Sequence, residues 1–373
     1  MRRKLERVAA ALLFALTLWP AATTLRTWRT FRGDALLRVD YSLYVATALL
    51  GLRQGWHHLY DLEAQRRLWQ QDVPGLWWFL NVYTPALSLA MVPFTFLSRD
   101  AGYALWGTLM LGCLLLSWAL LAPGDWIMRL AQLPMLFAPY PVGQGLWMGQ
   151  VISLEMAALA LAYFALRRGR ERTAGALLAV LVLKPQGLLL VPFALLAAGR
   201  KKLFATWAAC VGLIGVVLLA VVGFDGAFAY GERLSYAQSH LQEFWVAWSY
   251  SLARRMPGPA LRLVEVAAVA LTLLAARRHR ESPELVIAVG LVGSLVAAPF
   301  LHLDDFMLLF PAAWLLLRAL PGPLPAAAML LGYGAMLLSA DDAVGGRWIL
   351  LFICLLLPAL AALPPRRQAL LSP

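Results

Sequence analysis

The chain repeats apolar runs of about 15 to 22 residues, separated by short charged stretches, and runs of this length cross the hydrocarbon core of a bilayer. Inside that core every backbone polar group must be satisfied internally, so the runs must be helical. Composition agrees, because 61% of the residues are hydrophobic and 14% are charged. The sequence therefore predicts one all-α polytopic membrane domain over residues 1–373, with about 11–13 transmembrane or re-entrant helices.

Basic residues gather in short clusters between these runs, which gives a net charge of +12. The clusters are RRK at 2–4, RRGRER at 167–172, GRKK at 199–202, RRHR at 277–280 and PPRR at 364–367. In a soluble protein such a charge would suggest a nucleic-acid partner. Placed between apolar runs, the clusters instead follow the positive-inside rule, so we expect them and both termini in the cytoplasm. An additional role in binding lipid phosphates stays open.

The first apolar run, residues 8–25, follows a basic start and resembles the core of a signal peptide. Because many further runs already commit the chain to the membrane, we favour an uncleaved first helix. Two long loops should then face outward, at 26–75 and 223–257. Within the first loop, 57–72 predicts an amphipathic helix on the membrane surface, with apolar residues at roughly helical spacing: Leu59, Leu62, Leu68 and Trp69.

The next segments alternate in direction. We expect 77–97 to cross inward and 101–121 to cross outward. Residues 126–147 contain the interruption APYPVGQG and predict a short re-entrant pair at the outer face, because the next helix, 148–166, must end at a basic cluster.

A second break lies between two basic clusters, over residues 173–198. Both ends should be cytoplasmic, yet the segment is too short for two full spans. Pro185 lacks a backbone donor and disfavours a continuous helix. The sequence therefore predicts a hairpin of two half-length helices with Lys184-Pro185-Gln186 at its tip, followed by simpler spans at 203–222, 259–276, 284–300, 305–318, 323–339 and 347–363.

This topology brings many polar residues to the outer face. They are Asp40 with its neighbours Tyr41 and Tyr44, Tyr83, Thr84, Gln144, Gln150, Lys184, Gln186, Ser249, Ser251, His302, Asp304, Asp305, Asp341 and Asp342. Simple structural roles exist for several of them. Asp40 could cap a helix, Lys184 could extend to the interface, and Asp341 and Asp342 fit a solvated loop.

Ionisable groups within membrane spans are costly and usually line a functional site. Asp40, Lys184 and the HLDD stretch at 302–305 together supply an acid, a cation and a histidine. Such groups suit the transfer of a sugar from a lipid phosphate to a hydroxyl. The carboxylate would remove the acceptor proton, while the cation and the histidine would offset charge on the leaving phosphate.

Several sequence blocks resemble glycosyltransferase family 87, the bacterial polyprenyl-phosphate-mannose-dependent mannosyltransferases of the GT-C fold. The resemblance covers about residues 30–315. The blocks are VDYSLYVATALL with HLYD, VYTPALSLAMVPF, MGQVISLEMAALALAYFALRRGRERTAGALLAVLVLKPQGLLLVPF and APFLHLDDFMLLFPA. The third is the most specific, because Gly-Gln, basic residues, Ala-Gly and Lys-Pro-Gln follow one another in order.

The resemblance implies roles for particular residues. The family's first-loop aspartate, its catalytic base, falls on Asp40. Its Gly-Gln falls on Gly149-Gln150, and its Lys-Pro-Gln falls on residues 184–186. Its late Ser-Pro segment falls on Ala298-Pro299 and the following polar residues at 302–305. Substrate-binding roles are accordingly expected for Tyr41, Tyr44, Tyr83, Gln150, Lys184, Gln186, Ser251, His302, Asp304 and Asp305.

Two departures concern the substrate more than the reaction. The family's Tyr-Pro-Pro is Tyr83-Thr84-Pro85 here, and its serine before the late proline is Ala298. The resemblance thus implies an inverting transfer of mannose or a related sugar from a polyprenyl-phosphate donor to a glycan or glycolipid acceptor, at the outer face of a bacterial cytoplasmic membrane. The donor is a substrate, and no separate cofactor is expected.

Two other functions stay open from the residues alone. A lipid-linked sugar flippase or transporter also needs broken helices and buried charges, although no repeat relates the two halves of this chain. A lipid-linked glycan polymerase or ligase would share an outer-face polar site. Asp304, Asp305 and His302 could bind a cation, but adjacent acids offer few convergent ligands, and we expect no metal.

Overall fold

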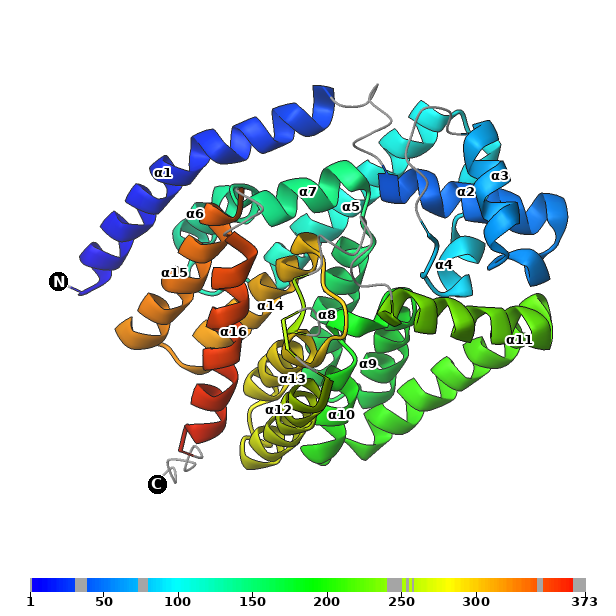
Figure 1. The fold of residues 1–373 in the computed structure, drawn as a ribbon. Helices are drawn as coiled ribbons and strands as arrows, with labels where there is room; N and C mark the ends of the chain where they lie inside the picture. The colour runs from blue at the N-terminus through cyan, green and yellow to red at the C-terminus, as the bar shows by residue number, and fades with distance from the viewer. Residues whose placement is uncertain are drawn as a thin grey trace.

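The computed structural model describes residues 2–30, 39–72, 80–239, 250–252, 255–256, 258–340 and 345–364. All regular elements in these ranges are helical. The first half contains α1 (Arg2–Thr30), α2 (Val39–Gln54), η3 (Trp56–His58), α3 (Leu62–Asp72), α4 (Pro85–Ala90), η4 (Val92–Phe96), α5 (Arg99–Leu121), α6 (Trp126–Phe137), α7 (Tyr140–Met148) and α8 (Ile152–Arg167). In Figure 1 these helices form the upper part of the molecule, and α8 lies near its centre.

The second half begins with the broken segment α9 (Glu171–Leu178), η5 (Ala179–Val182), η6 (Pro185–Gly187) and α10 (Leu190–Ala197). It continues with α11 (Lys201–Ser239), α12 (Gly258–Arg278), α13 (Pro283–Ala297), η8 (Leu303–Leu308), α14 (Leu309–Ala319), α15 (Pro323–Leu337), η9 (Leu338–Ala340) and α16 (Gly345–Ala362). The prediction of an all-α architecture is confirmed for the described residues.

Four of the described helices are long and apolar enough to cross a membrane: Arg7–Arg29, Arg99–Leu121, Lys201–Ala237 and Gly258–Arg278. The pair α7 and α8, bent by 110° at the break between them, passes the same test of length and composition when its two helices are taken together. Four further apolar helices are shorter, at 10–17 residues. The chain is thus polytopic, as predicted, and several of its predicted spans are short or broken.

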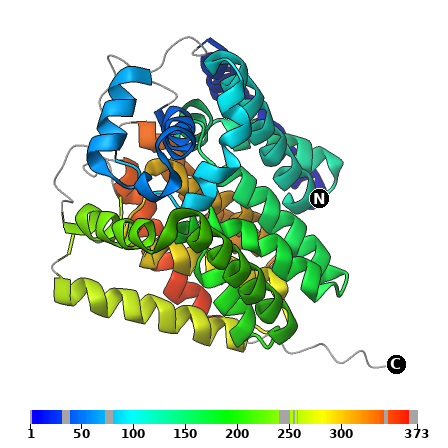
Figure 2. The same ribbon diagram turned by 90° about the vertical axis from the view of Figure 1, so that its right-hand side faces the viewer.

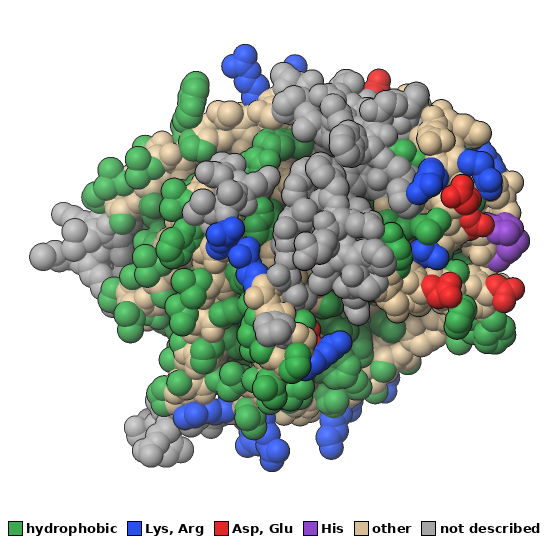
Figure 3. Space-filling model, in the orientation of Figure 1, with side chains coloured by type: hydrophobic (Ala, Val, Ile, Leu, Met, Phe, Trp, Pro, Cys, Tyr) green, Lys and Arg blue, Asp and Glu red, His purple; other side chains and the backbone are tan. Residues whose placement is uncertain are grey.

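The described basic clusters meet at one end of the bundle, which we call the basic end. Arg167 at the end of α8 pairs with Glu284 at the start of α13, with 3.1 Å between Nη1 and Oε1. Arg200 likewise pairs with Glu171 at the start of α9. Lys and Arg side chains project from the lower edge in Figure 3. α8 runs about 24 Å from there to the opposite end, which we call the cavity end because a large cavity lies there.

The predicted inward span at 77–97 is wrong. Its described part, residues 80–97, contains only the six-residue α4 and the five-residue η4, and Pro85 and Pro93 each lack a backbone donor. Thr84 Oγ1 donates to the Val182 carbonyl at the cavity end (2.9 Å). Phe94, near the other end of the segment, contacts the ring of Tyr41 on α2. Both ends of the segment therefore stay on the same side.

α5 forms as predicted but runs in the opposite direction. Near its start, Trp106 Nε1 donates to the Gly149 carbonyl at the cavity end (2.7 Å). Beyond its last residue, Asp125 pairs with Arg7 near the chain's basic start, with 3.4 Å between the side chains. The chain thus reaches the basic end at Leu121.

Residues 126–147 then return to the cavity end. The predicted pair of short helices is present as α6 and α7, but α6 begins at the basic end beside α1, so the pair is a broken crossing rather than a re-entrant loop. Pro139 directly precedes α7, and Pro141 is its second residue. Because neither has a backbone N–H to donate, α6 and α7 do not form one continuous helix. The two errors in the predicted topology cancel, and α8 still runs toward the basic end as predicted.

The hairpin predicted at 173–198 is confirmed. α9 and α10 have eight residues each, and the 3₁₀ turns η5 and η6 join them through Lys184, whose backbone (φ −146°, ψ 75°) is not helical. The hairpin packs against α11 and α13.

The predicted outer loop at 223–257 is wrong in its first part, because the chain stays helical to Ser239. Gly223, with φ of 71°, breaks α11 and lets residues 224–239 turn back over the cavity end (Figure 1). We call residues 224–239 the α11 arm. The ring of its Tyr230 lies 4.7 Å from that of Tyr60. Residues 240–249, which include Trp245, Trp248 and Ser249, lie outside the described residues, as do Asp341 and Asp342.

The helix predicted in the first loop is present as α3, beside α2 in Figures 1 and 2. Its Leu68 and Trp69 are buried against Leu43 and Leu50 of α2. The apolar face therefore packs on protein, and the predicted placement on the membrane surface is wrong for this face.

Candidate active site

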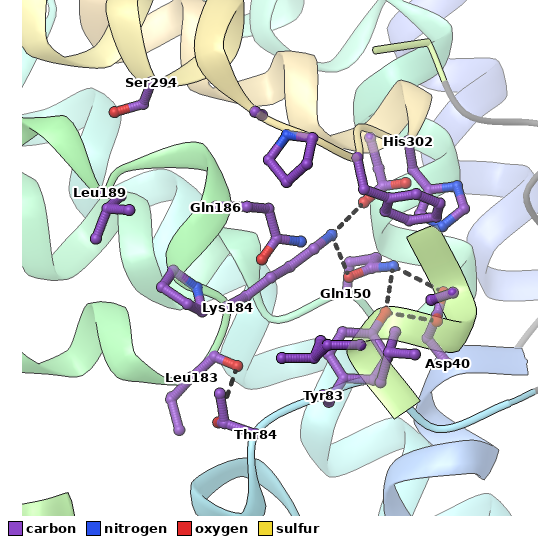
Figure 4. A pocket seen from close by; sticks show the side chains of 18 of the residues that line it. Asp40, Tyr83, Thr84, Gln150, Leu183, Lys184, Gln186, Leu189, Ser294 and His302 are labelled. Carbon is purple, nitrogen blue, oxygen red and sulfur yellow. Dashed lines mark hydrogen bonds and ion pairs between the residues drawn. The ribbon is translucent and has the colours of Figure 1, made fainter. Parts of the chain in front are cut away.

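A cavity of about 580 Å³ opens at the cavity end, lined by residues from segments far apart in the sequence. α2, the segment before α4, the α7–α8 junction, the 184–186 turn, the α11 arm, α12 and the chain after α13 all contribute. Figure 4 shows its polar wall, where Lys184, Gln150, Tyr83 and Asp40 are joined by hydrogen bonds. The structure thus assembles residues that the sequence placed only on a common face.

Asp40 lies in the first turn of α2 and is 9% exposed. Its Oδ1 accepts a hydrogen bond from the Tyr83 hydroxyl (2.9 Å), and its Oδ2 accepts one from Gln150 Nε2 (2.8 Å). These donors come from other segments, so the carboxylate takes part in a tertiary network rather than simply capping its own helix. It also lines the cavity, where a ligand could reach it.

Gln150 is the centre of this network. Its Oε1 accepts from the Tyr44 hydroxyl (3.1 Å) and from Lys184 Nζ (3.1 Å), while its Nε2 donates to Asp40. The preceding Gly149 has φ of 77°, and a Cβ there would lie 2.8 Å from Tyr41 Cβ. The Gly-Gln pair therefore makes the sharp turn between α7 and α8 and aims the amide at the cavity.

Lys184 is 2% exposed and fully engaged. Its ammonium lies 2.8 Å from Asp305 Oδ1, 3.2 Å from Asp304 Oδ2 and 3.1 Å from Gln150 Oε1. An ammonium has three N–H donors, so these three acceptors account for all of them. The turn preceding Pro185 thus places a buried cation between the late acids and the Asp40 network.

Sequence reasoning missed Glu155, which is 1% exposed on α8. Its Oε1 accepts a hydrogen bond from the backbone N–H of Lys184 (3.0 Å) and fixes the hairpin turn. The signal was available, because Glu155 is a lone acid within an apolar run.

His302 and Asp305 shape the chain after α13. The backbone N–H of His302 donates to Asp305 Oδ2 (2.7 Å), and the His302 ring lies edge-on to Phe300. Asp305 therefore bridges this backbone and Lys184.

Two site groups lie outside the membrane-spanning helices and have shifted pKa values. Burial, with a smaller contribution from Asp304, raises the pKa of Asp40 to about 7 against the opposing effects of Lys184 and two hydrogen bonds. Burial lowers the pKa of His302 to about 4. His302 is thus neutral near pH 7, so it would offset charge on a phosphate through a hydrogen bond and not through a positive charge. A neutral imidazole can still donate one hydrogen bond.

The remaining predicted residues divide into two groups. Gln186 lines the cavity, and Tyr44 supports it from behind through Gln150. Tyr41 does not line this cavity, and its ring packs against Phe94 and Tyr103 in the core. Ser251 is fully buried and does not line the cavity.

Gln144 of α7 also lines the cavity, and its buried Oε1 lacks a hydrogen-bond partner within the described part of the chain. An acceptor in this state is suited to a ligand hydroxyl. As for metals, the described residues contain no group of three His, Cys, Asp or Glu side chains that could hold an ion. Asp304 and Asp305 face Lys184 instead.

A carboxyl group with a pKa near 7, facing a cavity with largely apolar walls at one end of a helical bundle, can accept a proton from a bound hydroxyl. The fold thus defines an integral membrane protein whose cavity is lined by a carboxyl group able to take up a proton. The family model for glycosyltransferase family 87 matches residues 81–339, well over half of the chain. The protein therefore belongs to glycosyltransferase family 87, and it is a membrane glycosyltransferase.

No curated protein and no solved structure matches this chain. The matched segment begins at Asn81, so it includes Tyr83, Gln150, Lys184 and the late acids but not Asp40. The place of Asp40 in the site follows instead from its hydrogen bonds to Tyr83 and Gln150.

Proposed function

We propose that this glycosyltransferase moves mannose or a related sugar from a polyprenyl-phosphate donor to a hydroxyl of a glycan or glycolipid acceptor, with Asp40 as the general base. The observation that carries this proposal is Asp40 itself. Its carboxyl group faces the cavity, is held by two donors, and has a pKa of about 7, close to the ideal for a base acting near neutral pH.

The proposed reaction is a direct displacement. The acceptor oxygen forms a bond to the anomeric carbon, its proton passes to Asp40, and the bond from that carbon to the phosphate oxygen breaks. The phosphate leaves with the electron pair, and the configuration at the anomeric carbon is inverted. In this proposal, neutral His302, which lines the cavity, donates a hydrogen bond to the leaving phosphate, and the buried Gln144 Oε1 accepts one from a sugar hydroxyl.

Lys184 acts mainly as a positioning residue in this proposal. Because its three donors are bound by Gln150, Asp304 and Asp305, it aligns the amide that holds Asp40. It also keeps two buried acids charge-compensated. This role differs from direct binding of the leaving phosphate, which would require Lys184 to give up one of those contacts.

The cavity end faces the outer side of a bacterial cytoplasmic membrane in this proposal, with both termini in the cytoplasm. Support comes from the positive-inside rule, because the last turns of α8 and α12 and the first residues of α11 are basic and lie at the end of the bundle opposite the cavity. A lipid-linked donor suits that side, where nucleotide sugars are absent.

A test uses the purified protein in detergent with a set of polyprenyl-phosphate sugars and a glycan or glycolipid acceptor. We expect transfer of sugar without any ion gradient, with an inverted product. A flippase or transporter would give no covalent product, and a polymerase or ligase would transfer preassembled glycans instead. Absence of transfer from every polyprenyl-phosphate monosaccharide would refute the proposed donor class.

A further inference from the structure

The cavity has a second cation far less buried than Lys184. Among the described residues that line it, the permanently charged basic side chains are Lys184 and Arg262. Lys184 is 2% exposed and has spent its three donors on protein acceptors. Arg262 is 76% exposed. An anion that enters the cavity would therefore bind more readily to Arg262, whose N–H donors are accessible, than to Lys184.

Arg262 is held at the wall by its own helix. Residues 262, 265 and 269 of α12 all line the cavity, which fits one face of a helix because they are three, four and seven positions apart. Arg262 Nη1 lies 2.9 Å from Glu265 Oε2. A guanidinium has five N–H donors in a planar fork that matches phosphate oxygens, so one contact to Glu265 leaves most of the fork available.

The wall around Arg262 is apolar. Leu234 and Ala237 of the α11 arm, Val269 of α12 and Ala297 line the same cavity. On the outside, large apolar side chains of both elements are exposed: Phe224 (81%), Phe228 (72%), Leu263 (73%) and Val266 (67%). In a membrane protein such surfaces face lipid. A ligand that reaches the cavity past these surfaces needs a part compatible with lipid, and a negatively charged group on it would find an ion-pair partner in Arg262.

We propose that Arg262 forms the phosphate subsite for the lipid-linked donor, at a portal between the α11 arm and α12. This inference rests on the proposed function for the identity of the donor. The phosphate binds the guanidinium, the polyprenyl chain leaves the cavity between the α11 arm and α12 toward the bilayer, and the sugar extends toward Asp40. Glu265 orients the guanidinium through its ion pair.

The test measures binding, so it does not depend on turnover. Purified protein in lipid nanodiscs is titrated with undecaprenyl phosphate and, separately, with undecaprenol, which has the same chain and no phosphate. The variants are Arg262→Ala and, as a second variant that keeps a polar side chain, Arg262→Gln. The matched control is Arg277→Ala, an exposed arginine on the same helix at the basic end.

We expect wild type to bind the phosphate better than the alcohol. Arg262→Ala and Arg262→Gln should weaken binding of the phosphate by about 10- to 100-fold, the scale of hydrogen bonds to charged groups. Binding of the alcohol should not change, and Arg277→Ala should match wild type. Equal affinity of wild type for both ligands, or a phosphate affinity in both Arg262 variants equal to that of Arg277→Ala, would overturn the inference. Equal losses for both ligands would do the same, because they would indicate a packing role.

Transfer assays separate this inference from the proposed function. If wild type transfers sugar, Arg262→Ala should raise the KM for the donor with little change in kcat. If wild type binds undecaprenyl phosphate through Arg262 but transfers no sugar from it, the subsite stands and the proposed reaction fails.

Discussion

Replacing Asp40 by Asn removes the proposed base while keeping nearly the same side-chain volume. The network tolerates the change, because the amide oxygen can accept from Gln150 Nε2 and the NH₂ group can donate to the Tyr83 hydroxyl oxygen. Loss of one hydrogen bond to a charged group should cost the fold at most about 1–3 kcal/mol. Removal of negative charge near Asp304 offsets part of that cost. The variant should therefore fold.

Catalysis should suffer much more. A general base contributes about 10²–10⁴-fold, so we expect Asp40→Asn to lower kcat for sugar transfer by that factor. The assay is transfer from a polyprenyl-phosphate sugar by purified protein, with thermal unfolding measured on the same samples. The KM for the donor should change little, because Asp40 acts on the acceptor hydroxyl.

The control is Asp61→Asn. Asp61 is exposed, and its Oδ1 accepts a hydrogen bond from the backbone N–H of Ala64 at the start of α3. Asn caps helices about as well as Asp, so this variant should retain activity. The reasoning fails if Asp40→Asn is as active as Asp61→Asn, because Asp40 would then serve only as structure.

Three further predictions follow from the geometry. Since the pKa of Asp40 is about 7, the rate of sugar transfer should be half-maximal near pH 7. The rate should fall about tenfold per pH unit below pH 6 and level off above pH 8. A rate that does not change from pH 5.5 to 8 would contradict a titrating base. Lys184→Met leaves Asp304 and Asp305 buried without their cation, so it should lower the free energy of unfolding by about 3–5 kcal/mol. The control is Lys201→Met, which replaces an exposed lysine. Equal stability of the two variants would refute the buried ion pair. In a variant without the three native cysteines, Ser98→Cys should react with an impermeant thiol reagent in intact cells, whereas Arg172→Cys should react only after lysis. If Ser98→Cys did not react in intact cells, residues 77–97 would cross the membrane after all.

The charge distribution explains why the site tolerates so many acids. Asp40, Glu155, Asp304 and Asp305 are all at most 9% exposed, and Lys184 is the buried cation that contacts Asp304 and Asp305. Part of the negative charge must therefore be neutralised by protons, which agrees with the raised pKa of Asp40. A site of this kind can take up one more proton from a substrate when Asp40 is ionised.

Local sequence determined most of the helical stretches and several of the places where helices break, although not at 77–97 or 224–239. Apolar run length identifies membrane segments, and the breaks at Gly149-Gln150 and Lys184-Pro185-Gln186 follow from backbone rules for glycine and proline. The ordered Gly-Gln and Lys-Pro-Gln blocks were also sufficient to indicate the family that the comparison then matched. These features need no information about distant contacts.

Only the tertiary structure decided how those helices are directed and what they bury. The failed crossing at 77–97 depends on Thr84 reaching Val182 and Phe94 reaching Tyr41, and no local pattern specifies such contacts. Local sequence also does not specify what covers the apolar face of α3. An amphipathic helix gains a similar free energy by burying that face in lipid or against protein, and here it packs against α2. Sequence could place Asp40 and Lys184 on one face of the membrane. Their connection through Gln150 required a fold that brings α2, α8 and the hairpin turn within hydrogen-bond distance.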